Sequence, residues 1–307
     1  MNKTLYLILH ALFNQPEPLD LQESRLRRYL SKNQNVKRVL ISRNQSIIFD
    51  YSADHHVDEL YDLKSMTKSI LSLLIGIAID KGFIPCLDQK MMDYFSGHRH
   101  RIKDQRIHRI TLRHLLTMSS GFPYAFSLTS YNHFKTQPDL ILSNLSSTLQ
   151  FSPGEQFNYN EIDPHFLSII LTTASGRSAL EFAHEYLFRP LGIEQAQWNA
   201  DANGYNYGGV DLKLRADDLN RIGEICLNRG LFQQSPIISE QWLVEWAQVH
   251  IQGKEPLNEK YSLLWWISSV MDHPAIFAFG AGDQFLYLIP DLKVVISIFT
   301  NYTEPDN

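Results

Sequence analysis

The segment 65–81 constrains the fold of this chain more than any other part of the sequence. The apolar residues of this segment, which recur over most of the circumference of a helix, are Met66, Ile70, Leu71, Leu73, Leu74, Ile77 and Ala78. A helix that is apolar all round has to be buried. Gly82 follows the run and suits a helix C-terminus. We therefore predict a central helix around which the rest of the chain packs.

Two polar residues stand at the head of this helix. Ser65 and Lys68 are three positions apart, so a helix brings them onto one face. A serine hydroxyl is a weak nucleophile at neutral pH and needs a base, which a neighbouring lysine amine can supply or assist. The spacing alone also fits an N-cap serine followed by a solvated lysine, so other segments have to decide between the two interpretations.

Length and charge limit the classes of protein to consider. The 307 residues suffice for one large domain or two closely packed ones, and 44% hydrophobic with 20% charged residues is typical of globular chains. The net charge of −5 argues against a general nucleic-acid-binding protein. The basic stretch 98–113 is interpreted as a solvated loop rather than an anion-binding patch.

Cysteine usage and the N-terminal segment bear on location. Two cysteines, Cys86 and Cys226, imply no disulfide framework and favour a reducing cytoplasm. The apolar stretch Leu5–Phe13 is interrupted by His10, and no small-residue cleavage pattern follows it. We interpret this stretch as a helix or strand and expect a cytoplasmic protein without membrane insertion. The twelve histidines show no ligand spacing, so no metal site is predicted.

The pattern along the chain predicts β structure at both ends and helices between them. Residues 36–51 indicate a hairpin, and four strands are expected near the C-terminus, at 261–267, 275–279, 284–289 and 294–299. Helical segments without strand-like alternation are expected at 112–118, 138–149, 164–174 and 179–187, and further helices at 217–228 and 239–249.

These elements predict an α+β fold. Its antiparallel sheet would be built from both termini and flanked by helices, with an all-helical region inserted. The sheet domain would comprise residues 1–84 and 208–307, and the helical domain residues 85–207. An active site would lie in the cleft between the two domains.

A serine–lysine hydrolase needs a second proton-transfer group and backbone N–H donors for the oxyanion. The segment Pro153–Glu161 offers Tyr159, which on its own could be an ordinary half-buried loop tyrosine. The segment Phe279–Gln284 offers small residues, which allow a substrate close to the backbone but also fit a plain hairpin turn.

Five segments in order along the chain resemble those of the β-lactamase-related serine hydrolases. This family contains class C β-lactamases, D-alanyl-D-alanine carboxypeptidases and other penicillin-binding proteins, and esterases and amidases similar to 6-aminohexanoate-dimer hydrolase. The matching segments are 62–69, 110–121, 153–159, 208–219 and 280–295. The resemblance implies a β-lactamase/penicillin-binding-protein-like fold and the Ser-x-x-Lys acyl-enzyme chemistry of that family.

The resemblance also implies a role for each matched residue. Ser65 would be the acylated nucleophile, Lys68 would accept or relay its proton, and Tyr159 would pass a proton to the leaving group. Ser65 would also contribute its own N–H to the oxyanion hole, at a helix N-terminus that favours negative charge. The chemistry requires neither a metal nor a cofactor.

The second oxyanion N–H would come from the strand near the C-terminus. Gly280 matches the glycine of the family's third motif, and Ala281 after it would donate the N–H. A register shift to Gly282 or Gln284 is left open.

The chain departs from the family pattern at two places. The usual Tyr-x-Asn is replaced by Tyr159-Asn160-Glu161. A glutamate near Lys68 would favour the charged amine and shift the base role to Tyr159 or to a Lys–Glu pair, so Glu161 is a possible accessory residue.

The third motif also lacks its cation, because an alanine, Ala278 or Ala281, occupies that position. The family's cation meets a substrate carboxylate, so its absence favours a neutral substrate unless a distal arginine such as Arg113 substitutes. Four aromatic residues could shape an acyl pocket or simply pack in the core, namely Tyr124, Phe126, Trp265 and Trp266.

The sequence thus predicts a serine hydrolase that acts on a small-molecule ester or amide. One alternative is a β-lactamase or a D-alanyl-D-alanine carboxypeptidase/penicillin-binding protein, whose substrate would be a β-lactam or a D-alanyl peptide. The other is a non-catalytic ligand-binding relative with a decayed site. The sequence leaves the oligomeric state open.

Overall fold

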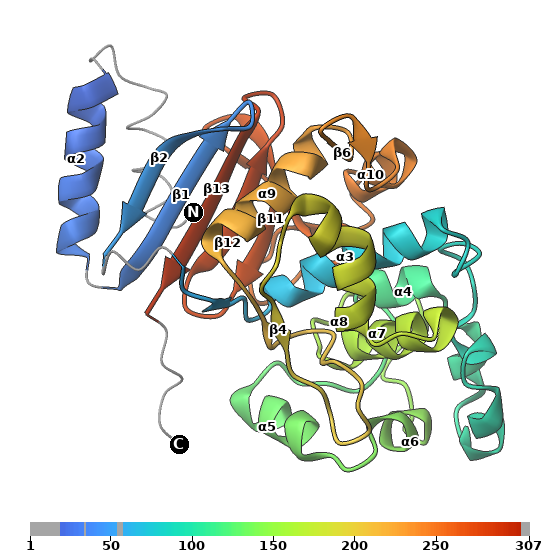
Figure 1. Cartoon of the computed structure of the whole chain (residues 1–307). Coiled ribbons are helices and arrows are strands. Elements are labelled where there is room, and N and C mark those ends of the chain that lie inside the picture. Colours follow the sequence, from blue (N-terminus) through green and yellow to red (C-terminus); the bar gives the residue numbers. More distant parts are fainter. Residues whose placement is uncertain (1–18, 34, 54–57, 302–307) are drawn as a thin grey trace.

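A computed structural model of the chain describes residues 19–33, 35–53 and 58–301 (Figure 1). The predicted N-terminal element at Leu5–Phe13 lies outside these residues. No helix among the described residues is long and apolar enough to cross a membrane.

An eight-stranded antiparallel sheet forms one side of the molecule (Figure 1). The strand order is β2-β1-β13-β12-β11-β10-β9-β8, in which β1 from the N-terminal region pairs with β13 from the C-terminal region. The strands are β1 (Val36–Arg43), β2 (Ser46–Ser52), β8 (Ile251–Gln252), β9 (Lys260–Tyr261), β10 (Trp266–Val270), β11 (His273–Gly280), β12 (Gln284–Ile289) and β13 (Val294–Thr300). The predicted sheet built from both ends of the chain is confirmed.

Helices fill the rest of the molecule. The α-helices are α2 (Leu19–Lys32), α3 (Met66–Asp80), α4 (Leu112–Leu116), α5 (Leu128–Thr136), α6 (Leu140–Leu145), α7 (Ile162–Ser175), α8 (Ala179–Ala183), α9 (Ala216–Leu227) and α10 (Glu240–Trp246). Shorter helical turns are η1 (Met91–Asp93), η2 (Ser96–Arg101), η3 (Gln105–Arg109), η4 (His184–Phe188) and η5 (Arg189–Leu191). Small sheets join β3 (Tyr61–Asp62), β5 (Leu212–Leu214) and β4 (Gln197–Trp198), and β6 (Leu231–Phe232) with β7 (Ser235–Pro236).

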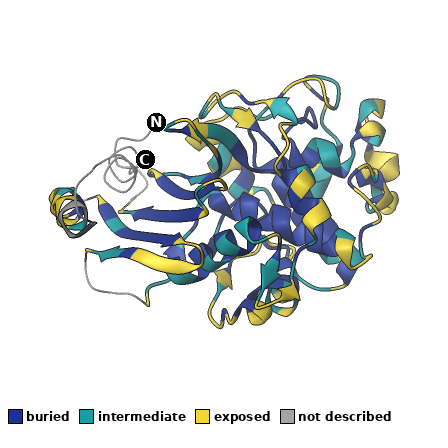
Figure 2. Ribbon diagram, turned by 90° about the horizontal axis from the view of Figure 1, so that it is seen from above, coloured by how far each residue is buried: buried dark blue, intermediate teal, exposed yellow. Residues whose placement is uncertain are grey.

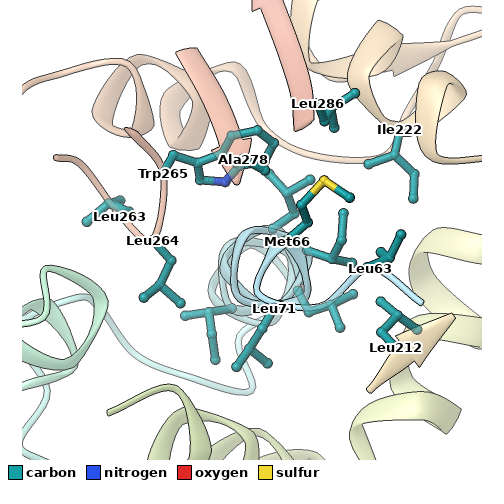
Figure 3. Close-up of a cluster of buried hydrophobic side chains, with 14 of the residues drawn as sticks. Leu63, Met66, Leu71, Leu212, Ile222, Leu263, Leu264, Trp265, Ala278 and Leu286 are labelled. Atoms are coloured by element: carbon teal, nitrogen blue, oxygen red, sulfur yellow. The ribbon is translucent and has the colours of Figure 1, made fainter. Parts of the chain in front are cut away.

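The helix α3 is the centre of the core, as its all-round apolar pattern predicts. Every residue from Met66 to Ala78 is buried, and α3 contacts β11 and β12 on one side and α7 and α8 on the other. Figure 3 shows Met66 of this helix beside Ala278 and Leu286 of the sheet and Ile222 of α9. Figure 2 shows that buried residues run through the strands and the central helices, while exposed residues lie on the outer helices and loops.

The structure contains elements that the sequence did not predict, among them α2, α5 and several two- or three-residue strands, and it departs from the predicted elements at two further places. The expected strand 261–267 is interrupted, because Leu264 adopts φ 60° and its N–H donates to the Leu116 carbonyl at 2.7 Å. The segment 85–207 also contains one short strand, β4, where only helices are predicted.

The close contact between α3 and α10 gives a test of this packing. A Cβ atom added at Gly76 would lie 2.5 Å from the Trp242 ring. Alanine in place of an interior helical glycine ordinarily gains about 1 kcal/mol, but overpacking costs about 1–3 kcal/mol. We expect Gly76→Ala to lower the free energy of unfolding, measured by urea denaturation.

The matched control is Gly97→Ala in η2, because a Cβ atom there would meet nothing within 4 Å. This variant is expected to be as stable as the wild type. A Gly76→Ala protein that is equally stable would contradict the described packing of α3 on Trp242.

Candidate active site

Ser65 lies at the turn between β3 and α3. Lys64, just before it, adopts the left-handed φ of 49°, and the Asp62 side chain accepts a hydrogen bond from the Lys64 N–H at 2.9 Å. The Ser65 side chain makes no capping bond to the helix that follows, within the described structure. Ser65 thus stands at the N-cap position of α3, as the alternative interpretation requires, but its partly exposed hydroxyl does not cap the helix and contacts Lys68 instead.

Lys68 lies one turn into α3, and its side chain is only 1% exposed. Its Nζ donates to Ser65 Oγ at 3.1 Å, to Glu161 Oε1 at 2.6 Å and to the Gly209 carbonyl at 3.1 Å. A lysine ammonium has three protons to donate, and these three acceptors account for all of them. The alternative of a solvated lysine is wrong.

Tyr159 is buried beside the same pair of residues. Burial raises the pKa of the Tyr159 hydroxyl, while the Lys68 charge and the neighbouring Ser65 and Lys68 side chains oppose that shift. The phenol is therefore protonated at neutral pH. Its ring stacks on Trp266 with centroids 5.8 Å apart, and Lys68 Nζ lies 5.0 Å from the ring centroid. Ser65, Lys68 and Tyr159 thus meet at one point.

Glu161 brings a carboxylate to this point. It stands at the N-terminus of α7, where the helix dipole favours negative charge. Its Oε2 atom is buried and has no hydrogen-bond partner among the described residues. The neighbouring Asn160 faces away, because its Oδ1 accepts from the Asp163 N–H at 2.6 Å. A carboxylate therefore contacts Lys68 in the place of the family's asparagine.

A second carboxyl group, that of Asp163, is buried below the site. It accepts a hydrogen bond from Ser120 Oγ at 2.5 Å, and burial raises its pKa to about 7. Because this folded-state pKa is above the ordinary value of 3.8, the unfolded chain loses this proton at a lower pH than the folded protein does. The contribution of Asp163 to folding stability therefore falls as the pH rises from about 4 to about 7 and stays level above that range.

Two of the matched segments hold Tyr159 in place through backbone hydrogen bonds. The Asn158 N–H donates to the Met118 carbonyl, the Gly154 N–H to Ser119 and the Gln150 N–H to Gly121, each at 2.8 Å. His114 closes a capping box with Thr111 at the start of α4. The segments 110–121 and 153–159 therefore form one rigid support. Their other residues position Tyr159 rather than take part in proton transfer themselves.

The end of β11 lies against the Ser65 turn. A Cβ atom at Gly280 would be 2.7 Å from the Leu63 carbonyl and 3.3 Å from Lys64 Cβ, so only glycine fits there without displacing the turn. Ala281 follows as the first residue of the hairpin turn. Gln284 pairs with Gly280 across the hairpin, and its side chain donates to the Asp62 carbonyl at 3.1 Å.

Arg113, the proposed substitute for the missing cation, is engaged elsewhere. It forms ion pairs with Asp88 and Glu245, with closest contacts of 2.8 and 2.6 Å. Ala278 is fully buried in β11. Neither residue supplies a cation to the Ser65 site.

The four aromatic candidates have different surroundings. Trp265 is a core residue whose Nε1 donates to the Ser69 carbonyl, and Trp266 is buried behind Tyr159. Tyr124 is half-buried. Phe126 is 52% exposed and its ring contacts Tyr159 edge-on, with centroids 5.6 Å apart. Of the four, Phe126 alone combines exposure with contact to a site residue.

The sequence reasoning missed Gly209, which lies against both charged groups. A Cβ atom there would be 1.9 Å from Glu161 Oε2 and 3.0 Å from Lys68 Nζ. A Cβ atom added at the neighbouring Gly208 would similarly lie 1.9 Å from the Pro164 carbonyl oxygen. The pair Gly208-Gly209 was the available signal in the sequence, because glycines often stand where the backbone closely approaches other groups.

Comparison with known proteins identifies related sequences. A sequence model of the family described as Beta-lactamase matches residues 38–307. The chain is 27% identical to lovastatin esterase of Penicillium rubens over 184 residues, which cover 53% of this chain and 44% of that protein. It is 21% identical to 6-aminohexanoate-dimer hydrolase of Paenarthrobacter ureafaciens over 294 residues, or 87% and 73% of the two chains. The chain thus matches less than half the length of the esterase.

Solved structures share the fold. A penicillin-binding protein homologue from Pyrococcus abyssi superimposes with a TM-score of 0.73 at 17% identity, covering 92% of this chain and 73% of that one. The predicted β-lactamase/penicillin-binding-protein-like α+β fold is therefore confirmed.

The position of Gly209 yields a prediction. The backbone of Gly209 does not adopt a positive φ, so Gly209→Ala tests the contact rather than backbone strain. The added methyl group would displace the Glu161 carboxylate from Lys68. We expect kcat to fall by about 10²-fold, the range of a lost proton-transfer group, in hydrolysis of p-nitrophenyl acetate.

Gly97→Ala again serves as the matched control. If the effect acts through Glu161, the losses caused by Gly209→Ala and Glu161→Gln will not add in the double variant. Wild-type kcat in Gly209→Ala would contradict the described geometry.

Proposed function

The chain belongs to the beta-lactamase family of serine hydrolases, and on this premise we propose that it hydrolyses an ester or amide through an acyl-enzyme at Ser65. The observation that carries this proposal is the 3.1 Å hydrogen bond between Lys68 Nζ and Ser65 Oγ in a buried setting. The proximity of Ser65 and Lys68, which lowers the pKa of the Tyr159 hydroxyl against the effect of burial, supports it. A serine held by two proton-transfer groups is the arrangement that nucleophilic catalysis needs.

Lys68 can accept the Ser65 proton only if its ammonium group gives up one of its own protons. All three ammonium protons are already donated, and the shortest bond, 2.6 Å, leads to Glu161. We assign the base role to the Lys68–Glu161 pair. As Ser65 Oγ bonds to the substrate carbonyl carbon, its proton passes to Lys68 and a Lys68 proton passes to Glu161.

Tyr159 acts at the departure of the leaving group. Its buried hydroxyl is protonated and can donate to the leaving oxygen or nitrogen, regaining a proton from Lys68. Water then attacks the acyl group on Ser65, and the same groups carry its proton in reverse. The oxyanion formed in each step would be bound by the N–H groups of Ser65 and Ala281.

The charges around the site favour an uncharged substrate. Lys68 is paired with Glu161, Ala278 stands where the family's cation would be, and Arg113 is paired with Asp88 and Glu245. A substrate carboxylate would therefore find no free partner among these cations. This argument favours a neutral ester or amide over a penicillin or a D-alanyl peptide.

The hypothesis of a decayed site has less support than catalysis. Ser65, Lys68 and Tyr159 remain in mutual contact, and Gly209 and Gly280 are glycines at positions where any side chain would disturb them. Such close packing around the three groups fits a working site.

The proposal predicts that Ser65 is essential while a neighbouring serine is not. We expect wild type to release p-nitrophenol from p-nitrophenyl acetate with an initial burst. Ser65→Ala should lose the burst and at least about 10³-fold in kcat. The control is Ser72→Ala in the same helix, whose buried hydroxyl has no hydrogen-bond partner among the described residues, so removing it should leave the rate unchanged.

Far-UV circular dichroism and thermal melts of the three proteins would establish matched folding. A Ser65→Ala protein with wild-type turnover would exclude Ser65 as the nucleophile.

A second prediction distinguishes the two possible bases. Glutamine at position 161 keeps the size of the side chain but cannot take a proton from Lys68. We expect Glu161→Gln to lower the acylation rate constant, measured in pre-steady-state assays, by about 10²-fold or more. Glu240→Gln, at a glutamate of α10 whose side chain is 61% exposed, is the control and should keep the wild-type rate.

If Glu161→Gln acylates at the wild-type rate while Tyr159→Phe does not, the base is Tyr159 and the assignment to the Lys68–Glu161 pair is wrong.

A further inference from the structure

A cavity of about 570 Å³ lies beside the Ser65 site, between the loop 123–125 and the helices α5 and α6. This volume is within the range of sites that bind small molecules. Ser65, Lys68 and Tyr159 do not line it. The cavity is therefore separate from the catalytic groups, and its relation to them depends on the residues that connect the two.

Tyr124 and Ile162 connect the cavity to the site, because both line the cavity and Tyr124 packs against the hydrophobic cluster that contains Ile162 and Tyr159 as well as against the cluster that contains Phe134 and Leu140. Ile162 directly follows Glu161 in the chain. The Tyr124 carbonyl accepts a hydrogen bond from Asn158 Nδ2 at 3.1 Å, one residue before Tyr159. Burial raises the pKa of the Tyr124 hydroxyl, and the charge of Glu161 adds to this effect. The cavity thus borders the groups proposed to move protons.

The polar lining of the cavity offers acceptors. Ser143 Oγ and Asn144 Nδ2 donate to the Leu140 carbonyl, and Ser147 Oγ donates to the Asn144 carbonyl. The two serine hydroxyl protons and one of the two Asn144 amide protons are used on nearby backbone carbonyls, while all three side-chain oxygens can still accept hydrogen bonds. A ligand that suits them carries O–H or N–H donors.

The remaining lining defines the other properties of the ligand. Among the described residues that line the cavity, none is Lys, Arg, Asp or Glu, and His133 is the one ionisable imidazole, so a charged ligand would find no permanent opposite charge in the wall. Tyr124, Phe134, Leu140 and Ile162 provide apolar surface. The complement of this cavity is an uncharged group with an apolar face and hydroxyl or amide donors.

We propose that the cavity holds the part of the substrate remote from the scissile bond, and that this part is uncharged, partly apolar and bears hydroxyl or N–H groups. The inference rests on the proposed hydrolysis at Ser65, because it concerns the substrate of that reaction. It adds a specificity determinant outside the catalytic groups, formed by α5, α6 and the loop 123–125.

The test fills the cavity from two sides. Ser130→Trp adds a large side chain from α5 and Ser147→Trp adds one from the bend that follows α6, both at positions that line the cavity. Asn132→Trp places the same side chain at an exposed α5 position that does not line the cavity. The substrates are p-nitrophenyl acetate, p-nitrophenyl hydroxyphenylpropanoate with its larger acyl group, and methylumbelliferyl acetate with its larger leaving group. Burst amplitude with p-nitrophenyl acetate counts folded active sites in each variant.

We expect both filled variants to raise KM by about tenfold or more, equivalent to about 1.4 kcal/mol, for at least one of the two larger esters. Their KM for p-nitrophenyl acetate should stay within about twofold of the Asn132→Trp control. If both filled variants match the control with all three esters, the cavity does not hold the substrate and the inference is overturned. The acetate burst would still support the proposed function in that case, whereas a wild type without a burst on any ester would contradict the proposed function itself.

Discussion

A lysine ammonium buried against a glutamate carboxylate is the interaction on which the site depends. Removing one partner of a buried ion pair leaves an uncompensated charge and costs about 3–5 kcal/mol, so Lys68 and Glu161 hold each other in place. The pair joins α3 to the start of α7, two helices that the chain reaches 93 residues apart. Gly209 fits between them because it has no side chain. Three distant segments are thereby fixed around one amine.

Backbone hydrogen bonds and close backbone contacts hold Tyr159 and the end of β11 near this amine. The segment 110–121 holds the segment 150–158 through backbone hydrogen bonds and so fixes Tyr159. The Leu264 N–H donates to Leu116, which ties the start of β10 to the same support. On the other side, the bare backbone of Gly280 brings the end of β11 against the turn at Leu63 and Lys64. The site is therefore assembled from both the sheet and the helical part (Figure 1).

The sequence predicted those features that leave a periodic or local trace. The buried α3 follows from its apolar circumference, and the hairpin of β1 and β2 from two β-rich runs around a turn. The contact of Ser65 with Lys68 follows from helical spacing. The resemblance of five segments indicated Tyr159 and the fold. Each of these depends on residues close together in the chain.

The features that the sequence did not predict depend on contacts between distant segments. Gly209 acquires its importance only when α3 and α7 meet beside it. The interrupted strand 261–267 results from a backbone contact of Leu264 with Leu116, and the pairing of Arg113 with Glu245 joins residues 132 positions apart. The cavity near Tyr124 likewise needs α5 and α6 in place. The most direct test of the central claim is mass spectrometry of enzyme quenched in acid during the burst with p-nitrophenyl acetate. An acetyl group on the peptide that contains Ser65 is the predicted result, and a burst with the label on another residue, or with none, would contradict it.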